Sequence, residues 1–147
     1  MIREFAKNDF ETFLELSREF YSTTAVDHKI PDEFRDETFI ASVSDCPFAK
    51  GYIIEASNGE VAGYGLISLT FSGEVGGEVV LLEELYIRDK FQGQGLGTKY
   101  FEFIESSFPE AKRFRLEVTR VNAGAIRLYE RLGYEEISYK QMSKDLV

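Results

Sequence analysis

The feature that most restricts the possible folds is a change of hydrophobic period at Gly51. From that residue, apolar and polar residues alternate in two runs, YIIEAS and VAGYGLISLTF, and the dipeptide Asn58-Gly59 between them is typical of a hairpin turn. A glycine-rich turn then leads into a third long run of the same kind, EVVLLEELYIRDKF. Residues 51–91 therefore predict three consecutive strands joined by turns.

Segments with helical spacing precede these strands. Residues 2–6 alternate as a first short strand, and Asn8 is the predicted cap of a helix whose apolar face extends to about residue 22. Pro31 opens a second, weaker helix, DEFRDETFIASV, which the turn around Pro47 ends. We therefore expect one strand and two helices before the hairpin.

Helices and strands alternate in the last third of the chain. Apolar residues at helical spacing follow residue 95 until Pro109, and RFRLEV (113–118) alternates as a strand. Asn122 caps a helix, AGAIRLYERL, that stops at Gly133, and YEEISYKQM (134–142) predicts a last strand. The predicted order is β-α-α-β-β-β-α-β-α-β, an α/β (α+β) fold.

Size and charge narrow the classes of function. A chain of 147 residues fits one domain with a real core, and it contains no repeat or linker. Its 17 Lys and Arg against 26 Asp and Glu give a formal net charge of −9, which argues against nucleic acid and anionic membrane as partners and favours a cationic one. The single cysteine and the lack of a membrane-length apolar run or signal-peptide core favour a cytoplasmic location.

The most unusual stretch is FQGQGLGTKY (91–100), in which three glycines occupy alternate positions before a predicted helix. Glycine allows positive φ and lets a ligand approach the backbone, and the first N–H groups of a helix point outward at the positive end of its dipole. The stretch predicts either an anion site, most naturally for phosphate, or a simple strand-to-helix connection. It is neither a dinucleotide fingerprint nor a P-loop, because the glycine spacing differs and Lys99 is not part of G-K-[ST].

Two motifs together resemble the GNAT superfamily of acetyl-CoA-dependent N-acyltransferases. Residues 92–97 (QGQGLG) match its Q/R-x-x-G-x-G/A phosphate loop, and residues 122–134 match its N-x-x-A-x-x-L-Y-x-x-x-G-F/Y signature. The resemblance makes residues 1–147 one acetyltransferase domain with a mixed central sheet flanked by helices. Residues 51–140 would form its CoA-binding core, and residues 1–50 a variable segment on the acceptor side.

The resemblance also implies which residues bind acetyl-CoA. The glycine loop would hold the pyrophosphate with backbone N–H groups, and the preceding strand would pair with the pantetheine arm through the main chain of Leu85 and Ile87. Asn122 would cap its helix and also bond the CoA arm. The implied cofactor-binding residues are Leu85, Tyr86, Ile87, Gln92, Gly93, Gln94, Gly95, Leu96, Gly97, Thr98, Asn122, Ala125 and Tyr129.

Acyl transfer from a thioester to an amine needs an acceptor for the amine proton and a donor for the leaving thiolate. Tyr129 is the predicted donor, because a phenol stays protonated at neutral pH and can pass its proton to the sulfur. Glu83 is the preferred proton acceptor and Glu84 the second choice. The resemblance implies this order, because family members with an acidic pair at this position often use the first acid as the base. Without a bulge the two side chains face opposite sides of the strand, and both could instead form ordinary ion pairs.

Other residues have weaker claims to a functional role. Tyr21, Tyr86 and Phe34 could line the acceptor pocket or belong to the core. His28 is expected to be a solvent-exposed loop residue, and Cys46 lies far in sequence from any histidine that could activate it. No group of residues has metal-ligand spacing, so the sequence predicts no metal.

The preferred function is transfer of an acetyl group from acetyl-CoA to a small amine or polyamine-like cation by direct attack, without a covalent intermediate. A protein lysine or N-terminal amine is an alternative acceptor, and it would need an open groove. A non-catalytic module that senses acyl-CoA is the other alternative. Two chains could associate as a homodimer through the terminal segment 134–147.

Overall fold

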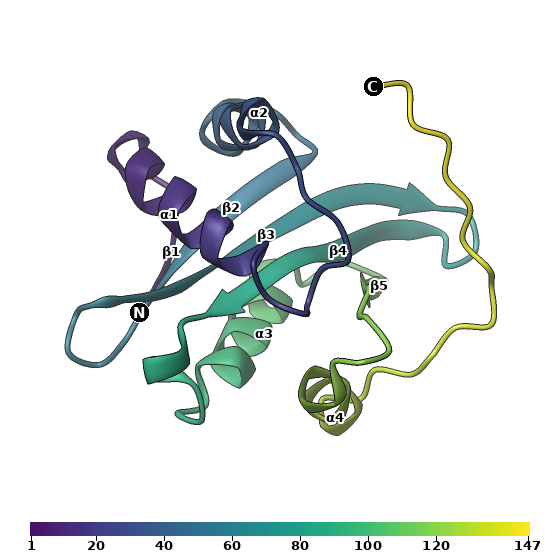
Figure 1. Cartoon of the computed structure of the whole chain (residues 1–147). Coiled ribbons are helices and arrows are strands. Elements are labelled where there is room, and N and C mark those ends of the chain that lie inside the picture. Colours follow the sequence, from purple (N-terminus) through teal and green to yellow (C-terminus); the bar gives the residue numbers. More distant parts are fainter.

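Five of the predicted strands form one mixed sheet in the computed structural model, which describes residues 1–147 (Figure 1). Four strands pair antiparallel in the order β1-β2-β3-β4, and β5 joins the free edge of β4 in the parallel direction. The sheet therefore has the mixed character that the sequence predicts. Its strands are β1 (Ile2–Glu4), β2 (Ala49–Glu55), β3 (Val61–Ser72), β4 (Gly77–Ile87) and β5 (Arg113–Leu116).

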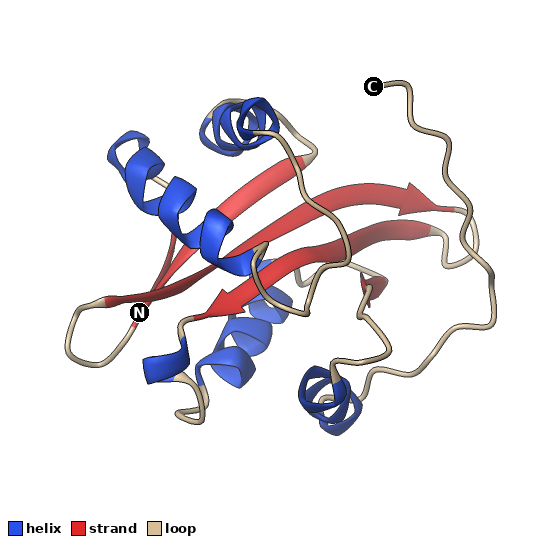
Figure 2. Ribbon diagram, in the orientation of Figure 1, coloured by secondary structure: helices blue, strands red, loops and turns tan.

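Helices cover both faces of the sheet (Figure 2). Helices α1 and α2 lie over one face, and α3 and α4 lie on the other side (Figure 1). The apolar run of β2 serves both layers, because Ile53 packs in the core under α1 and α2 while Tyr52 and Ile54 pack in the core with α3. The helices are α1 (Phe10–Phe20), α2 (Asp32–Val43), α3 (Leu96–Ser107) and α4 (Ala123–Arg131), with short 3-10 turns at Lys7–Asp9 and Asp89–Phe91.

The predicted last strand, residues 134–142, is not formed. The chain beyond Tyr134 is exposed and pairs with no strand, and it runs away from the sheet past the ends of β3 and β4 (Figure 1). An alternating pattern becomes a strand only where a neighbouring edge supplies hydrogen bonds and one face is buried. Neither condition is met here, so the prediction of a final strand is wrong.

An ion pair that the sequence did not reveal joins strand β1 to the start of α1. Both nitrogens of the Arg3 guanidinium fork donate to the Asp9 carboxylate, at 2.7 and 3.0 Å, and the Ala6 N–H donates to the same carboxylate at 2.7 Å. Asp9, rather than the predicted Asn8, therefore forms the turn into α1. This bidentate contact links β1 to α1.

Replacement of Asp9 by Asn is expected to lower the free energy of unfolding by about 2 kcal/mol at pH 7, because a partly buried, hydrogen-bonded charge pair is broken. The hydrogen bonds from Arg3 hold the pKa of Asp9 below its ordinary value. Its contribution is therefore complete above about pH 4 and is lost as the pH falls through the lowered folded-state pKa.

Urea denaturation of both proteins between pH 7 and pH 2 measures this effect. The stability difference should be largest at neutral pH and shrink on the acid side. Asp36→Asn, at an exposed position of α2, is the matched control and should change stability by less than about 0.5 kcal/mol. An Asp9→Asn difference that does not depend on pH would contradict the ion-pair explanation.

Candidate active site

The sheet opens between β4 and β5. The two strands pair only from Val79 with Arg113 to Leu82 with Leu116, whereas β4 continues to Ile87. Residues 83–87 therefore have no neighbour on that edge, and strand β5 is two residues shorter than predicted. Main-chain groups of Leu85 on this edge can pair with an extended ligand, as was expected, whereas the carbonyl of Ile87 already accepts from the side chain of Gln92. The side chains of Leu85 and Ile87 pack against the α3 core.

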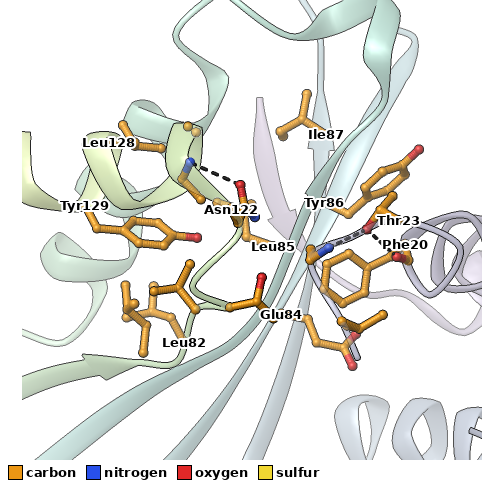
Figure 3. Close-up of a pocket in the computed structure, with 18 of the residues that line it drawn as sticks. Phe20, Thr23, Leu82, Glu84, Leu85, Tyr86, Ile87, Asn122, Leu128 and Tyr129 are labelled. Carbon is orange, nitrogen blue, oxygen red and sulfur yellow. Dashed lines mark hydrogen bonds between the residues drawn. The ribbon is translucent and has the colours of Figure 1, made fainter. Parts of the chain in front are cut away.

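A cleft of about 1430 Å³ occupies this opening. Its walls are the connection between α1 and α2, the second half of β4, the glycine loop, residues 115–122 and α4 (Figure 3). Every residue predicted to bind cofactor or act in catalysis lines the cleft except Gln94, whose side-chain amide donates to the carbonyl of Lys90 at 3.4 Å. The structure thus brings the two sequence motifs and the acidic pair to one place.

The glycine loop, residues 92–97, connects the 3-10 turn that follows β4 to the start of α3. Gly93 and Gly95 have positive φ values of 75° and 77°, and neither would bring an added Cβ within 4 Å of another residue, so it is the backbone conformation that requires glycine. Gly95 is the N-cap of α3 and no side chain caps this end. The first backbone N–H groups of α3 therefore lie uncapped at the cleft, where a phosphate can accept from them.

The end of β4 and the glycine loop are tied together. The side-chain amide of Gln92 donates to the carbonyl of Ile87 at 2.9 Å. At the other end of the loop, an added Cβ on Gly97 would lie 3.3 Å from a methyl group of Leu128, so glycine here lets α3 and α4 approach closely. The loop is held between the strand and two helices, which supports a preformed anion site.

Strand β4 contains a β-bulge at the acidic pair. Leu66 of β3 pairs with Glu84 and Ile67 pairs with Leu82, so Glu83 is the extra residue of the bulged strand. A bulge interrupts the regular alternation of side chains and lets two consecutive residues lie on one face. The opposite-face arrangement was expected only for a strand without a bulge, so it does not apply to Glu83 and Glu84.

Hydrogen bonds show that both carboxylates lie on the face covered by α1 and α2. The phenols of Tyr21 and Tyr64 donate to the two oxygens of Glu84, each at 2.6 Å. The hydroxyl of Ser68 donates to Glu83 at 2.5 Å. Neither carboxylate is in an ion pair, so the alternative of ordinary strand-end ion pairs does not apply.

The two carboxylates have different environments. Burial raises the pKa of Glu84, and the like charge of Glu83 acts in the same direction, while the two phenol hydrogen bonds oppose the shift. Glu83 is exposed to the cleft. The pair thus combines one enclosed acid, with both oxygens occupied, and one accessible acid.

Tyr129 lies on α4, across the cleft from β4. Its ring packs against Phe101, with ring centroids 5.4 Å apart, and its hydroxyl points into the cleft toward the strand that carries Glu84 and Leu85 (Figure 3). Burial raises the pKa of Tyr129, so the phenol keeps its proton at neutral pH. As predicted, Asn122 caps α4, accepting from the N–H of Ala125 at 3.3 Å.

The connection between α1 and α2 forms the outer wall. The hydroxyl of Thr119, in the segment after β5, donates to the carbonyl of Thr24 at 3.1 Å and so bridges the cleft. Tyr21 and Tyr86 line the cleft, but Phe34 is 41% exposed and lies outside it. The suggestion that Phe34 lines an acceptor pocket is therefore wrong.

The remaining predicted candidates take no central position. His28 is at the edge of the cleft, exposed and bonded to Asp27 at 2.8 Å, and Cys46 lies outside the cleft. The structure gathers no group of three His, Cys, Asp or Glu side chains that could hold a metal ion. None of its helices is long and apolar enough to span a bilayer.

Two residues that shape the site were not singled out from the sequence. Tyr64 is one of several apolar residues in an alternating strand, and Thr119 is an ordinary loop residue. Tyr64 bonds to Glu84 and Thr119 bonds to Thr24, and each partner is at least 20 positions away in the sequence. No local pattern marks such contacts.

Comparison with known proteins is consistent with this arrangement. The model of the Acetyltransferase (GNAT) family matches residues 10–134. The thialysine N-ε-acetyltransferase of Mus musculus is 28% identical over 148 aligned residues, which cover 93% of this chain and 85% of the mouse protein.

Two solved structures share the fold over nearly the whole chain. An integron cassette protein from the mobile metagenome of Cole Harbour Salt Marsh has a TM-score of 0.80 at 19% identity, covering 99% of this chain and 90% of its own. The aminoglycoside N-acetyltransferase AAC(6')-Iy, in complex with the bisubstrate analogue CoA-S-monomethyl-acetylneamine, has a TM-score of 0.78 at 16% identity, covering 100% and 98%.

Proposed function

The chain belongs to the GNAT family and is an acetyl-CoA-dependent N-acetyltransferase, and we propose that its acceptor is a small, cationic primary amine. The observation that carries the proposal is the acidic pair, since Glu83 and Glu84 lie on one face of β4 inside an acidic protein. Two carboxylates beside a cleft attract an ammonium group. The name of the mouse relative describes acetylation of the ε-nitrogen of thialysine, also a small amine.

The bridged cleft favours a small acceptor over a protein lysine. The contact between Thr119 and Thr24 crosses the cleft on the acceptor side, whereas a polypeptide would need an open groove. Family membership likewise favours the enzyme over a non-catalytic acyl-CoA sensor. We therefore place the amine between β4 and the connection from α1 to α2.

The residues around the cleft suggest how transfer proceeds. The glycine loop and the uncapped end of α3 hold the pyrophosphate, and the free edge of β4 holds the pantetheine arm. Glu83, which is accessible, takes one proton from the bound ammonium, and the neutral amine nitrogen then attacks the thioester carbonyl while Glu84 supplies a fixed negative charge. The carbon–sulfur bond breaks, the departing thiolate takes the proton of Tyr129, and the phenolate of Tyr129 takes the second proton from the amide nitrogen.

Thiol release from acetyl-CoA tests the acceptor class. Polyamines, thialysine, lysine, aminoglycosides and lysine peptides are offered at equal concentration, with acetyl-CoA binding followed by calorimetry. Small cationic amines should give the highest kcat/KM, by at least about tenfold over peptides. Faster turnover with peptides would overturn the proposed acceptor class while leaving the family assignment untouched.

Substitution of the accessible acid tests its role as base. Glu83→Gln should lower kcat by at least about tenfold near neutral pH, with acetyl-CoA affinity within about threefold, because a glutamine cannot take the amine proton. Glu78→Gln, on the same strand but outside the cleft, is the matched control and should behave as the wild type. An active Glu83→Gln enzyme would assign the base to Glu84 or to water.

A further inference from the structure

A buried arginine on α2, Arg35, contacts a tyrosine of the proposed acceptor site. Arg35 is only 6% exposed, and its Nε donates to the hydroxyl of Ser17 on α1 at 3.0 Å. Its Nη1 donates to the carbonyl of Ile30 at 3.2 Å and to the carboxylate of Asp32 at 2.9 Å. Since the Asp32 side chain is 60% exposed, a solvated carboxylate is the only acid bonded to this buried cation.

Tyr21 joins this arginine to the acidic pair. The guanidinium carbon of Arg35 lies 5.3 Å from the centroid of the Tyr21 ring, within the range of a cation–π contact. The hydroxyl of the same tyrosine donates to Glu84 at 2.6 Å. One side chain therefore contacts a buried cation with its ring and a partly buried carboxylate with its hydroxyl.

We propose that Arg35 is a positioning residue that holds Tyr21 in place and keeps Glu84 ionised at the acceptor site. The inference rests on the proposed function, in which a fixed charge on Glu84 helps to bind a cationic amine. A buried carboxylate stays charged only where opposite charge or hydrogen-bond donors offset its lost hydration. The phenols of Tyr21 and Tyr64 supply the donors, and Arg35 supplies the opposite charge.

The groups around Glu84 determine in which direction its pKa should change when Arg35 is removed. Burial and Glu83 raise the pKa of Glu84, whereas the two phenols and the positive charge of Arg35 lower it. Removal of Arg35 should therefore let Glu84 take up a proton at a higher pH. The titratable and charged groups that face Glu84 or its partner Tyr21 are Tyr21 from the end of α1, Tyr64 from β3, Glu83 from β4, Arg35 from α2, and His28, paired with Asp27, from the connection between α1 and α2.

The test is a titration of the Glu84 carboxyl in the free protein. Carbon-13 NMR of protein labelled at glutamate side-chain carboxyls follows its midpoint, with Glu84→Gln used to assign the resonance. Arg35→Met keeps the length of the side chain but removes its charge, and it should raise the midpoint by about one pH unit or more. Arg35→Lys, which retains the charge, should raise it less.

Steady-state kinetics supply the second measurement. At neutral pH, Arg35→Met should raise KM for a small diamine by about tenfold or more, with KM for acetyl-CoA within about threefold. The acidic limb of kcat/KM should move to higher pH together with the NMR midpoint. A purely structural role of Arg35 in α2 would lower the melting temperature without moving either titration.

Tyr21→Phe keeps the inference testable if Arg35→Met fails to fold. This variant retains the ring under the guanidinium but removes one donor to Glu84, so the midpoint should again rise. An unchanged midpoint in a folded Arg35→Met or Tyr21→Phe protein would overturn the inference. Because the titration needs neither acceptor nor turnover, it stands even if the proposed acceptor class is wrong.

Discussion

Replacement of Tyr129 by Phe is expected to lower kcat by about 100-fold or more while acetyl-CoA affinity stays within a few-fold. The ring of a phenylalanine can keep the contact with Phe101, so only the hydroxyl in the cleft is lost. Without it, the thiolate leaves as an anion in a partly buried site, where charge is poorly solvated. Pre-steady-state thiol release separates this step from acetyl-CoA binding.

Tyr134→Phe is the matched control for this experiment. Tyr134 packs against Phe101 beside Tyr129, with its ring centroid 5.5 Å from that of Phe101, but it does not line the cleft. Its loss of a hydroxyl should therefore change kcat by less than about twofold. Equal activity in Tyr129→Phe and the wild type would remove Tyr129 as the proton donor and leave that role to solvent.

The pH dependence of turnover gives an independent test of the same residue. Burial raises the pKa of Tyr129 above the ordinary value of a phenol, so the donor keeps its proton through neutral pH and loses it only in strongly basic solution. Turnover by the wild type should fall as the pH rises through that value. This basic limb should be absent from the residual activity of Tyr129→Phe.

Replacement of Gly63 by Ala is expected to lower the free energy of unfolding by about 3 kcal/mol or more. Gly63 pairs with Ile87 across β3 and β4. An added Cβ would collide with the carbonyl oxygen of Tyr86 and would lie 2.9 Å from its carbonyl carbon and 3.1 Å from the Cα of Ile87. Because these are backbone atoms, the strands themselves would have to separate.

The same substitution should also weaken acetyl-CoA binding, since the displaced segment of β4 is the one whose free edge faces the cleft. Urea denaturation and calorimetric titration measure the two effects. Gly73→Ala is the matched control, because an added Cβ there meets nothing within 4 Å, and its stability should change by less than about 0.5 kcal/mol. A Gly63→Ala protein as stable as this control would show that β3 and β4 adapt without loss.

Local patterns in the sequence predicted most of the elements and the phosphate loop. Alternation identified β2, β3 and β4, and helical spacing identified α1, α3 and α4. The three glycines of residues 93–97 were expected to allow positive φ, and Gly93 and Gly95 adopt it, whereas Gly97 does not. These features depend on the conformational preferences of residues that are neighbours in the sequence, so a short stretch of sequence is enough to predict them.

The main errors concern strand pairing and burial, which depend on distant parts of the chain. Residues 134–142 have an alternating pattern but find no strand edge, so they remain unpaired. Glu83 and Glu84 were expected on opposite faces of a strand without a bulge, but the register between β3 and β4 shifts beside them and places both on one face. Phe34 occupies an exposed position on α2, which its local sequence could not reveal.

The sequence by itself therefore determined the order of elements as far as α4, the glycine loop and the family, because each rests on short stretches of neighbouring residues. Only the tertiary structure decided how β4 and β5 separate, and that Tyr21 bonds Glu84 across 63 positions of sequence. Such contacts depend on strand register and helix packing. Register and packing are determined by all the interactions of the folded chain together. The surroundings of Glu83 and Glu84, which set the charge of this pair, are likewise decided by the tertiary structure.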